Sequence, residues 1–181
     1  MLDKYSPEVI ERAKKIKLLI LDVDGVLTDG RIIYGNYGDE IKNFDVNDGL
    51  GIYLLKKAGI KCVVLTAKAS PVVTKRAREL RIDKVYHNFH YKIDALRKMR
   101  RKFRIKSDEE ICFIGDDLID IPVLKRAGLS VCPPNAMEEV KPFTHFITGA
   151  SGGRGAVREV CELIMKAQGA WEDVTSRYFN D

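Results

Sequence analysis

The chain lacks an apolar run long enough to span a membrane. Its N-terminal stretch, MLDKYSPEVIERAKKI, mixes charges throughout and lacks the apolar core of a signal peptide. These two absences make a cytoplasmic location the default expectation and argue against a membrane partner. Hydrophobic residues make up 45% of the 181 residues and charged residues 31%, a composition typical of a soluble globular protein.

The cysteines form no metal-binding or redox motif. Cys62, Cys112, Cys132 and Cys161 lie far apart, without a C-x-x-C pair and without nearby histidines. Three of the four lie in strand-like apolar runs. We therefore expect reduced, buried thiols rather than a zinc site or disulfide bonds.

Positive charge is in moderate excess. The net charge of +5 and the isoelectric point near 9.0 favour anionic ligands. The most basic stretch is KMRRKFRIK, residues 98–106, and it has neither interleaved aromatic residues nor a glycine-rich RNA motif. We interpret it as the solvated face of a helix and expect no nucleic-acid partner.

Strand-like apolar runs alternate with helical patterns from end to end. Strands are expected at residues 17–22, 61–66, 84–87, 110–115, 129–132 and 145–148. Helices are expected at residues 7–15, 50–59, 71–80, 92–103, 118–128, 136–141 and 155–168. This alternation predicts an α/β fold: a three-layer, doubly wound parallel sheet with right-handed crossovers and helices on both faces. We expect a single domain spanning residues 1–181.

Local signals place some element boundaries. Ser6 followed by Pro7 predicts the start of the first helix, whereas Asp48 is expected to cap a helix that Gly59 ends. Residues 31–46 break the alternation, because RIIY and EIKNF are short strand-like runs separated by GNYGD. This segment predicts a β-hairpin flap after the first strand.

Acidic residues follow two of the buried strands. The stretch KLLILDVDGVLTDG places Asp22 and Asp24 at the end of the first strand, and Asp116 and Asp117 follow the fourth. In a doubly wound sheet, ligands bind beyond these carboxyl ends. Carboxylates clustered in this way repel one another unless a cation neutralises them. Oxygen ligands without His or Cys suit a hard ion such as Mg²⁺, which commonly shares a phosphate.

Thr66 ends the second strand, and Lys92 begins the helix after the third. A hydroxyl and an amine at these places can hold phosphoryl oxygens. One carboxylate can attack phosphorus, and a second can protonate the leaving alkoxide and later activate water. The pattern therefore predicts Mg²⁺ and a phosphoryl group at this edge, with a chance gathering of loop aspartates as the alternative.

Motifs in this order and spacing resemble those of the haloacid dehalogenase superfamily of phosphatases: DVDGVLTDG, Thr66, Lys92 and GDDLID at residues 115–120. FDVNDGLGI and GGRGAVREVCELI are similar to one branch, the 3-deoxy-D-manno-octulosonate 8-phosphate phosphatases. The similarity covers about residues 16–169. It implies a Rossmann-like fold without a cap domain and Mg²⁺-dependent hydrolysis of that sugar phosphate through an aspartyl-phosphate, in lipopolysaccharide precursor biosynthesis.

The resemblance also implies roles. Asp22 would be the nucleophile and Asp24 the general acid/base. Mg²⁺ would be held by Asp22, the backbone carbonyl of Asp24, and Asp116, while Asp117 and Asp120 would support these ligands from behind. The implied substrate-binding residues are Asp24, Asp45, Val46, Asn47, Asp48, Gly49, Lys68, Arg76 and Lys92.

The chain departs from the branch at one position. Where the branch has Thr-Gly-Arg, this chain reads Thr66-Ala67-Lys68. Because lysine is a point charge, it cannot repeat a bidentate guanidinium contact. The substrate is therefore left open between the octulosonate and another phosphorylated sugar acid, such as N-acylneuraminate 9-phosphate.

Other function classes fit the residues less well. Halide removal has no need of the acid at Asp24, and the absence of a cap between the motifs counts against a sugar phosphomutase. A phosphate-sensing scaffold domain is the non-enzymatic alternative, since receiver domains also combine Mg²⁺ with an acid cluster.

A glycine-rich stretch, GGRG at residues 152–155, precedes the last helix. It could cradle an anion at the helix N-terminus or form an ordinary turn and cap. Both interpretations are left open.

The hairpin and the C-terminal tail, residues 170–181, suggest a homotetramer whose subunits complete one another's active sites. An uncapped site would stand open to water. The hairpin and tail carry more apolar surface than a monomer should expose, namely Ile32, Ile33, Tyr34, Ile41, Phe44, Trp171, Tyr178 and Phe179. The alternative is that both segments fold back on their own subunit. The resembling branch is tetrameric with such hairpin contacts.

Overall fold

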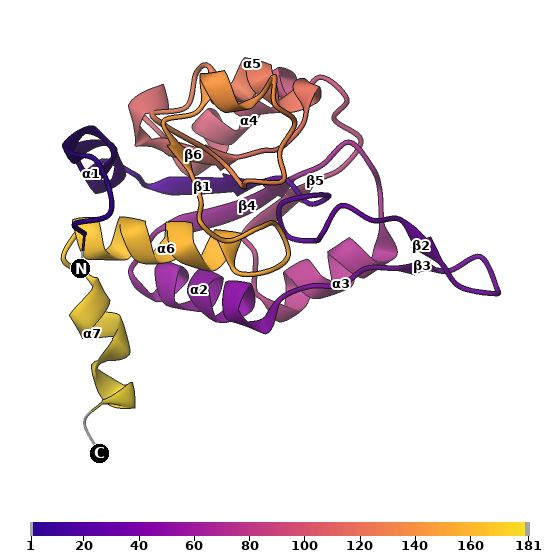
Figure 1. The fold of residues 1–181 in the computed structure, drawn as a ribbon, viewed down its shortest axis with the longest axis horizontal. Helices are drawn as coiled ribbons and strands as arrows, with labels where there is room; N and C mark the ends of the chain where they lie inside the picture. The colour runs from indigo at the N-terminus through magenta and orange to yellow at the C-terminus, as the bar shows by residue number, and fades with distance from the viewer. Residues whose placement is uncertain (1, 180–181) are drawn as a thin grey trace.

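Short apolar runs form a six-stranded parallel sheet in this computed structural model, which describes residues 2–179 (Figure 1). The strands are β1 (Leu18–Leu21), β4 (Lys61–Leu65), β5 (Lys84–Tyr86), β6 (Ile111–Ile114), β7 (Leu129–Cys132) and β8 (Phe146–Ile147). Their order is β5-β4-β1-β6-β7-β8, and each neighbouring pair is parallel. The predicted α/β class and doubly wound sheet are confirmed, with β1 at the centre.

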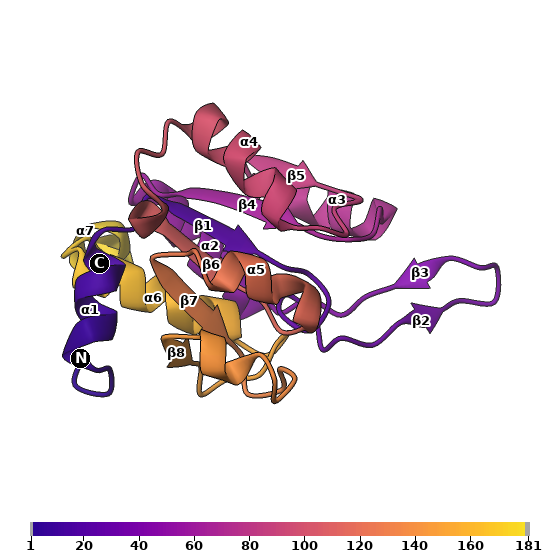
Figure 2. The ribbon, with the colours of Figure 1, turned by 90° about the horizontal axis from the view of Figure 1, so that it is seen from above.

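Helices cover both faces of the sheet (Figures 1 and 2). One face carries α1 (Pro7–Lys14), α2 (Val46–Lys57), α3 (Pro71–Glu79) and α6 (Ala156–Ala167), and the other carries α4 (Ile93–Phe103) and α5 (Ile121–Leu124). Successive side chains of β1 alternate between the two layers: Leu19 and Leu21 join one apolar cluster, Leu18 and Ile20 the other. β1 is therefore buried on both sides, as its unbroken apolar run predicts.

Several boundary signals act as expected. The Ser6 hydroxyl accepts a hydrogen bond from the N–H of Val9 at the start of α1, and Gly59 follows α2 with φ +86°. All four cysteines are buried and free, as predicted. Among residues 2–179, no helix combines the length and the apolar character needed to cross a membrane.

Three helix predictions are wrong. Asp45, not Asp48, caps α2, and its carboxylate accepts from the N–H of Asn47 at 2.6 Å. Residues 136–140 form a bend and turns before a 3₁₀ helix (Lys141–Phe143), because so short a helix has little stability of its own. The helix expected at 118–128 is a 3₁₀ turn (Leu118–Asp120) followed by the short α5.

The hairpin lies outside the main sheet and projects away from it (Figure 2). Its strands, β2 (Ile33–Tyr34) and β3 (Glu40–Ile41), are antiparallel and only two residues long. Tyr34 is 70% exposed and Ile41 42%, whereas Phe44 packs against the core. The expected hairpin is present, with a shorter ladder than the apolar runs suggested.

The C-terminal tail likewise has one aromatic residue packed against the core and others exposed. α7 (Trp171–Thr175) places Trp171 against the core of its own chain, contrary to the expectation that it lies outside. Tyr178 and Phe179 are 50% and 76% exposed. Residues 180 and 181 of the predicted tail lie outside the described residues.

Candidate active site

Parallel pairing brings the ends of three strands to one edge. Asp22 follows β1, Thr66 follows β4 and Asp116 follows β6, and β1 lies between the other two strands. An open pocket of about 280 Å³ lies at this edge. It is lined by Asp22, Asp24, Gly30, Ile32, Thr66, Ala67, Lys68, Asp116, Asp117 and Ile119. The structure thus brings together the residues that the sequence places at the carboxyl ends of the strands.

Lys92 links two of the acids below this pocket. It precedes α4, and its Nζ lies 2.8 Å from Asp22 Oδ1 and 2.6 Å from Asp120 Oδ1. The side chains of Lys92 and Asp120 are fully buried. Asp120 Oδ2 also accepts from the backbone N–H groups of Asp116 and Asp117, at 2.9 and 3.2 Å. Asp120 therefore ties the loop after β6 to Lys92, and both of its oxygens are engaged.

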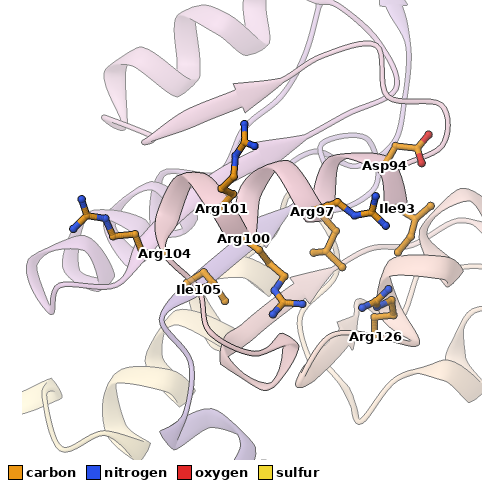
Figure 3. A pocket seen from close by; sticks show the side chains of 9 residues that line it. Ile93, Asp94, Arg97, Arg100, Arg101, Arg104, Ile105 and Arg126 are labelled. Atoms are coloured by element: carbon orange, nitrogen blue, oxygen red, sulfur yellow. The ribbon is translucent and has the colours of Figure 1, made fainter.

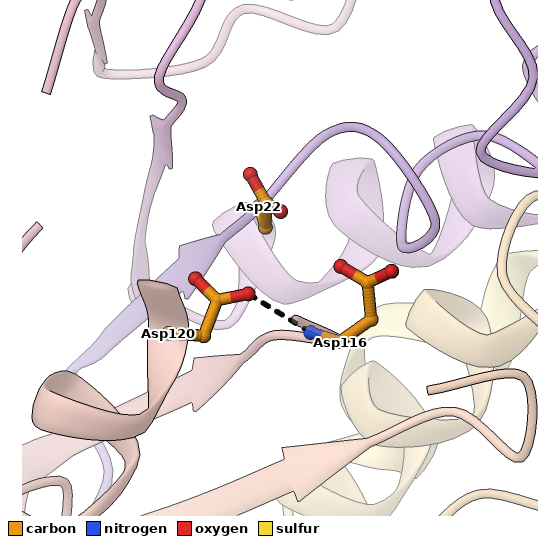
Figure 4. Close-up of side chains that lie close together, drawn as sticks. All are labelled: Asp22, Asp116 and Asp120. Carbon is orange, nitrogen blue, oxygen red and sulfur yellow. Dashed lines mark hydrogen bonds between the residues drawn. The ribbon is translucent and has the colours of Figure 1, made fainter. Parts of the chain in front are cut away.

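Oxygen atoms of Asp22, Asp116 and Asp120 lie within 4.8 Å of one another (Figure 4). Burial, followed by the charge of Asp120, raises the pKa of Asp22 to about 7. Burial, followed by the charge of Asp22, raises the pKa of Asp116 to about 8. Asp116 Oδ1 is buried and has no hydrogen-bond partner within the described structure. Close carboxylates with an unsatisfied oxygen fit a hard divalent cation.

Gly25 allows the loop after β1 to approach these acids. A Cβ at this position would overlap the Asp116 carboxylate, and its φ of +84° suits glycine. Asn135 holds the same loop: its Nδ2 donates to the Gly25 carbonyl at 2.9 Å, and its Oδ1 accepts from the N–H of Gly152 at 2.7 Å. Asn135 was missed at the sequence level, because it lies in an irregular stretch and gives no periodic signal.

The contacts of the GGRG stretch favour a turn. Any side chain at Gly152 or Gly153 would overlap backbone of the loop after β1, at Gly25 and Thr28. The N-terminus of α6 is already occupied, because Asp48 Oδ1 accepts from the N–H of Arg158 at 2.7 Å. The anion at this helix start is therefore a carboxylate of the chain itself.

Asp24 is held by a lysine that sequence reasoning also missed. Lys42 Nζ lies 2.5 Å from Asp24 Oδ1 and 3.1 Å from Glu40 Oε1, and the Lys42 side chain is 1% exposed. Burial acts to lower the pKa of Lys42, but its hydrogen bonds to the two carboxylates outweigh burial and raise it. The only signal was a glutamate and a lysine two residues apart, on one side of an extended run.

The segment 45–49 and Arg76 lie outside the pocket. Arg76 Nη2 donates to the Asp45 carbonyl at 3.3 Å, and its guanidinium lies 5.8 Å from the Phe44 ring centroid. Val46 is 81% exposed, whereas Asp48 is 1% exposed and faces α6. Of the implied substrate contacts away from the acids, the structure brings only Lys68 to the pocket.

Asn47 and Gly49 complete that segment. Asn47 is exposed. Gly49 is buried, and a Cβ there would lie 2.7 Å from Arg76 Nη2. The segment therefore packs on Arg76 within its own subunit.

Among the larger hollows, one adjoins the acid pocket and another lies apart from it. One, of about 920 Å³, shares Ala67 and Lys68 with the acid pocket and is bounded by Tyr34, Glu40 and His90. The other, of about 910 Å³, lies over α4 and contains Arg97, Arg100, Arg101, Arg104 and Arg126 (Figure 3). Of these five arginines, only Arg100 is not exposed, so the basic helix face is solvated as predicted. The smaller acid pocket has the chemistry of a catalytic site, because its lining combines carboxylates with a hydroxyl and the buried Lys92 contacts Asp22.

Comparison with known proteins agrees with this geometry. Residues 65–159 match the haloacid dehalogenase-like hydrolase family. The chain is 42% identical, over 93% of its length and 89% of the relative's, to 3-deoxy-D-manno-octulosonate 8-phosphate phosphatase from Salmonella typhimurium.

Two crystal structures are also similar along nearly the whole chain. One is the 3-deoxy-D-manno-octulosonate 8-phosphate phosphatase from Moraxella catarrhalis with a magnesium ion, a phosphate ion and a KDO molecule. Its TM-score is 0.93 and its identity 40%, over 96% of this chain and 99% of that one. The other is a probable phosphatase from Pseudomonas syringae, with TM-score 0.94 and 39% identity over 97% and 99%. The chain therefore belongs to the haloacid dehalogenase-like hydrolases, in the family of the 3-deoxy-D-manno-octulosonate 8-phosphate phosphatases.

Proposed function

We propose that this chain is a Mg²⁺-dependent phosphatase that hydrolyses 3-deoxy-D-manno-octulosonate 8-phosphate to the free sugar acid and phosphate. The observation that carries this proposal is the cluster of Asp22, Asp116 and Lys92 beneath an open pocket. The names of the relatives and the KDO molecule in the Moraxella structure support the substrate.

Asp22 is the nucleophile in this proposal. Its carboxylate oxygen bonds to phosphorus while the bond from phosphorus to the sugar oxygen breaks, and Asp24 gives its proton to that oxygen. Asp24 then takes a proton from water, the water oxygen bonds to phosphorus, and Asp22 is released with inorganic phosphate. Lys92 and Thr66 hold the phosphoryl oxygens, and Lys92 also orients the Asp22 carboxylate.

Mg²⁺ would be held by the carboxylates of Asp22 and Asp116 and by the backbone carbonyl of Asp24. The orphaned Asp116 Oδ1 and the raised pKa values of both carboxyls support this assignment. When bound, the ion stabilises negative charge on the phosphoryl group. Asp120 and Asp117 support the loop that carries Asp116.

The sugar lies in the hollow between the hairpin and the loop after β4, in this proposal. That hollow continues from the acid pocket through Lys68, which can meet the sugar carboxylate as a point charge. N-acylneuraminate 9-phosphate is the second candidate, because this lysine stands where the family has arginine.

Phosphate release from a panel of sugar phosphates tests the substrate. We expect kcat/KM for the octulosonate 8-phosphate to exceed that for unrelated phosphomonoesters by about 10²-fold or more. Equal efficiency across the panel would disprove the specificity, whereas preference for the nine-carbon acid would favour the second candidate. Turnover lost on adding EDTA and recovered with Mg²⁺ tests the metal.

We also propose a cytoplasmic homotetramer. Four buried free thiols suit a reducing compartment. Exposed apolar residues of the hairpin and tail (Ile32, Tyr34, Ile41, Tyr178, Phe179) offer contacts between copies, and the exposed Val46 and Asn47 could then meet a neighbouring site. Sedimentation of the intact chain and of a version ending at Ala170 tests this. A fully active monomer would contradict it.

A further inference from the structure

Lys42 connects the candidate acid/base to the base of the hairpin. Its ammonium lies between Asp24 Oδ1, at 2.5 Å, and Glu40 Oε1, at 3.1 Å. Glu40 Oε2 in turn accepts from the Ser70 hydroxyl at 2.5 Å, and Ser70 caps α3. Four side chains thus form one continuous chain from the loop after β1 to the start of α3.

This series of hydrogen-bonded side chains fixes the position of the Lys42 ammonium. Its side chain is 1% exposed, and a buried ammonium is tolerated only beside carboxylates that compensate the lost water. Glu40 and Ser70 anchor it on one side, so the Asp24 carboxylate is the other partner that it needs. The fixed ammonium therefore sets the direction in which Asp24 Oδ1 points.

The Asp24 side chain depends on Lys42 for its orientation, because little else restrains it. Its side chain is 31% exposed, and the residue lies in the turn after β1 rather than in a strand, so packing alone does not fix its rotamer. With Oδ1 bonded to Lys42, Oδ2 is the oxygen that can exchange a proton with a leaving group in the pocket. An acid displaced by about 1 Å protonates its target far less well.

We propose that Lys42 is a positioning residue that aims the Asp24 carboxyl at the leaving-group oxygen. This inference rests on the acid/base role proposed for Asp24. It gives the hairpin a part in the chemistry, because the aiming lysine and its anchor, Glu40, both come from the hairpin strand and its continuation.

The test is the dependence of kcat/KM on the leaving group, because kcat/KM reports the steps up to the expulsion of that group. A sugar alkoxide and phenolate need protonation, whereas p-nitrophenolate leaves without much help. For Lys42→Met we expect kcat/KM to fall by about 10²-fold on the sugar phosphate, by about 10-fold on phenyl phosphate and by less than about threefold on p-nitrophenyl phosphate. Asp24→Asn should show the same order of losses in kcat/KM, with larger differences between the three esters.

Lys56→Met is the matched control. Lys56 is another lysine in a partly buried ion pair, 2.5 Å from Asp83, and neither residue lines the pocket. Its loss should affect all three substrates equally. If Lys42→Met does not fold, as judged by its melting temperature, Glu40→Gln loosens the same anchor and should show the same order with smaller factors.

The outcomes separate the inference from the proposed function. An equal loss on all three esters in Lys42→Met would make Lys42 merely structural, and a rise in KM for the sugar phosphate alone would make it a substrate contact. Either result overturns the inference while Asp24→Asn still shows leaving-group dependence. If Asp24→Asn shows none, the acid/base role itself is wrong and the inference falls with it.

Discussion

Two buried lysines each hold one of the two candidate catalytic aspartates, and they do so from different parts of the fold. Lys92 lies between Asp22 and Asp120, where the core is closed and the side chains are at most 9% exposed. Lys42 lies between Asp24 and Glu40, whose side chains are 31% and 20% exposed. The first cluster belongs to the main sheet and the second to the hairpin region.

The difference shows how the site divides its tasks. Burial acts to lower the pKa of Lys92, but the charges of Asp22 and Asp120 outweigh burial and raise the pKa, so a charged ammonium faces the candidate nucleophile. The strands on both sides of β1 keep this cluster rigid. Asp24 is held by Lys42, which follows the short two-stranded ladder that projects from the molecule. The candidate nucleophile is therefore fixed by the core, and the candidate proton donor by a peripheral element.

Asp22→Asn changes the candidate nucleophile in the rigid core cluster, and we expect this substitution to have the largest effect on activity. The amide keeps the shape but cannot attack phosphorus, so kcat should fall by roughly 10⁴-fold or more. Steady-state phosphate release measures this. Asp29→Asn, in the same loop, is the control and should stay within about threefold of wild type. A rate near normal in Asp22→Asn would rule out the covalent route.

The two lysines should also differ in how much each contributes to the free energy of unfolding. Lys92→Met leaves Asp22 and Asp120 buried without their cation, which typically costs about 3–5 kcal/mol. Lys42→Met leaves two partly hydrated carboxylates, and we expect about 1 kcal/mol. Urea unfolding in EDTA gives both free energies. Equal losses would show that the hairpin cluster is as desolvated as the core cluster.

The proposed Mg²⁺ site gives a further contrast, because its ligands belong to the core cluster. The pKa values of Asp22 and Asp116 are raised to about 7 and about 8, so both carboxyls lose their protons only as the pH rises through that range. Mg²⁺ binds the deprotonated forms, and its stabilisation should grow from about pH 6 to about pH 9. At 100 times the dissociation constant it amounts to about 2.7 kcal/mol.

Melting curves with and without Mg²⁺ at both pH values measure this effect. Asp116→Ala should remove most of it, whereas Lys42→Met should leave it. A shift that is independent of pH would mean that the ion binds elsewhere.

The same contrast separates what the sequence could predict from what it could not. Asp22, Thr66 and Asp116 were predicted to meet because each ends an apolar strand, and parallel pairing carries strand ends to one edge. Lys42 and Asn135 were not predicted, because their contacts depend on how irregular segments turn. Asp48 was taken for a helix cap from local spacing, but its partner, Arg158, is 110 residues away. Periodicity identifies the core cluster, whereas long-range contacts of single side chains need the structure.

Asp48 is a buried carboxylate without a lysine partner in residues 2–179. It is 1% exposed, one oxygen accepts from the N–H of Arg158, and Oδ2 is buried without a partner among the described residues. Burial raises the pKa of its carboxyl to about 6. Because the unfolded value is near 3.8, the folded state favours the protonated form, and the charged form destabilises it at neutral pH.

Asp48→Asn keeps an acceptor for Arg158 and cannot ionise. The wild type should therefore gain stability relative to this variant as the pH falls from about 7 through 6 to about 4, by about 2–3 kcal/mol, because the pKa is raised from 3.8 to about 6 and each unit is worth about 1.4 kcal/mol. Asp48→Ala loses the hydrogen bond and should be destabilised at every pH. Urea unfolding at several pH values measures both differences. A difference between wild type and Asp48→Asn that stays constant with pH would mean that the folded protein compensates the charge of Asp48 fully.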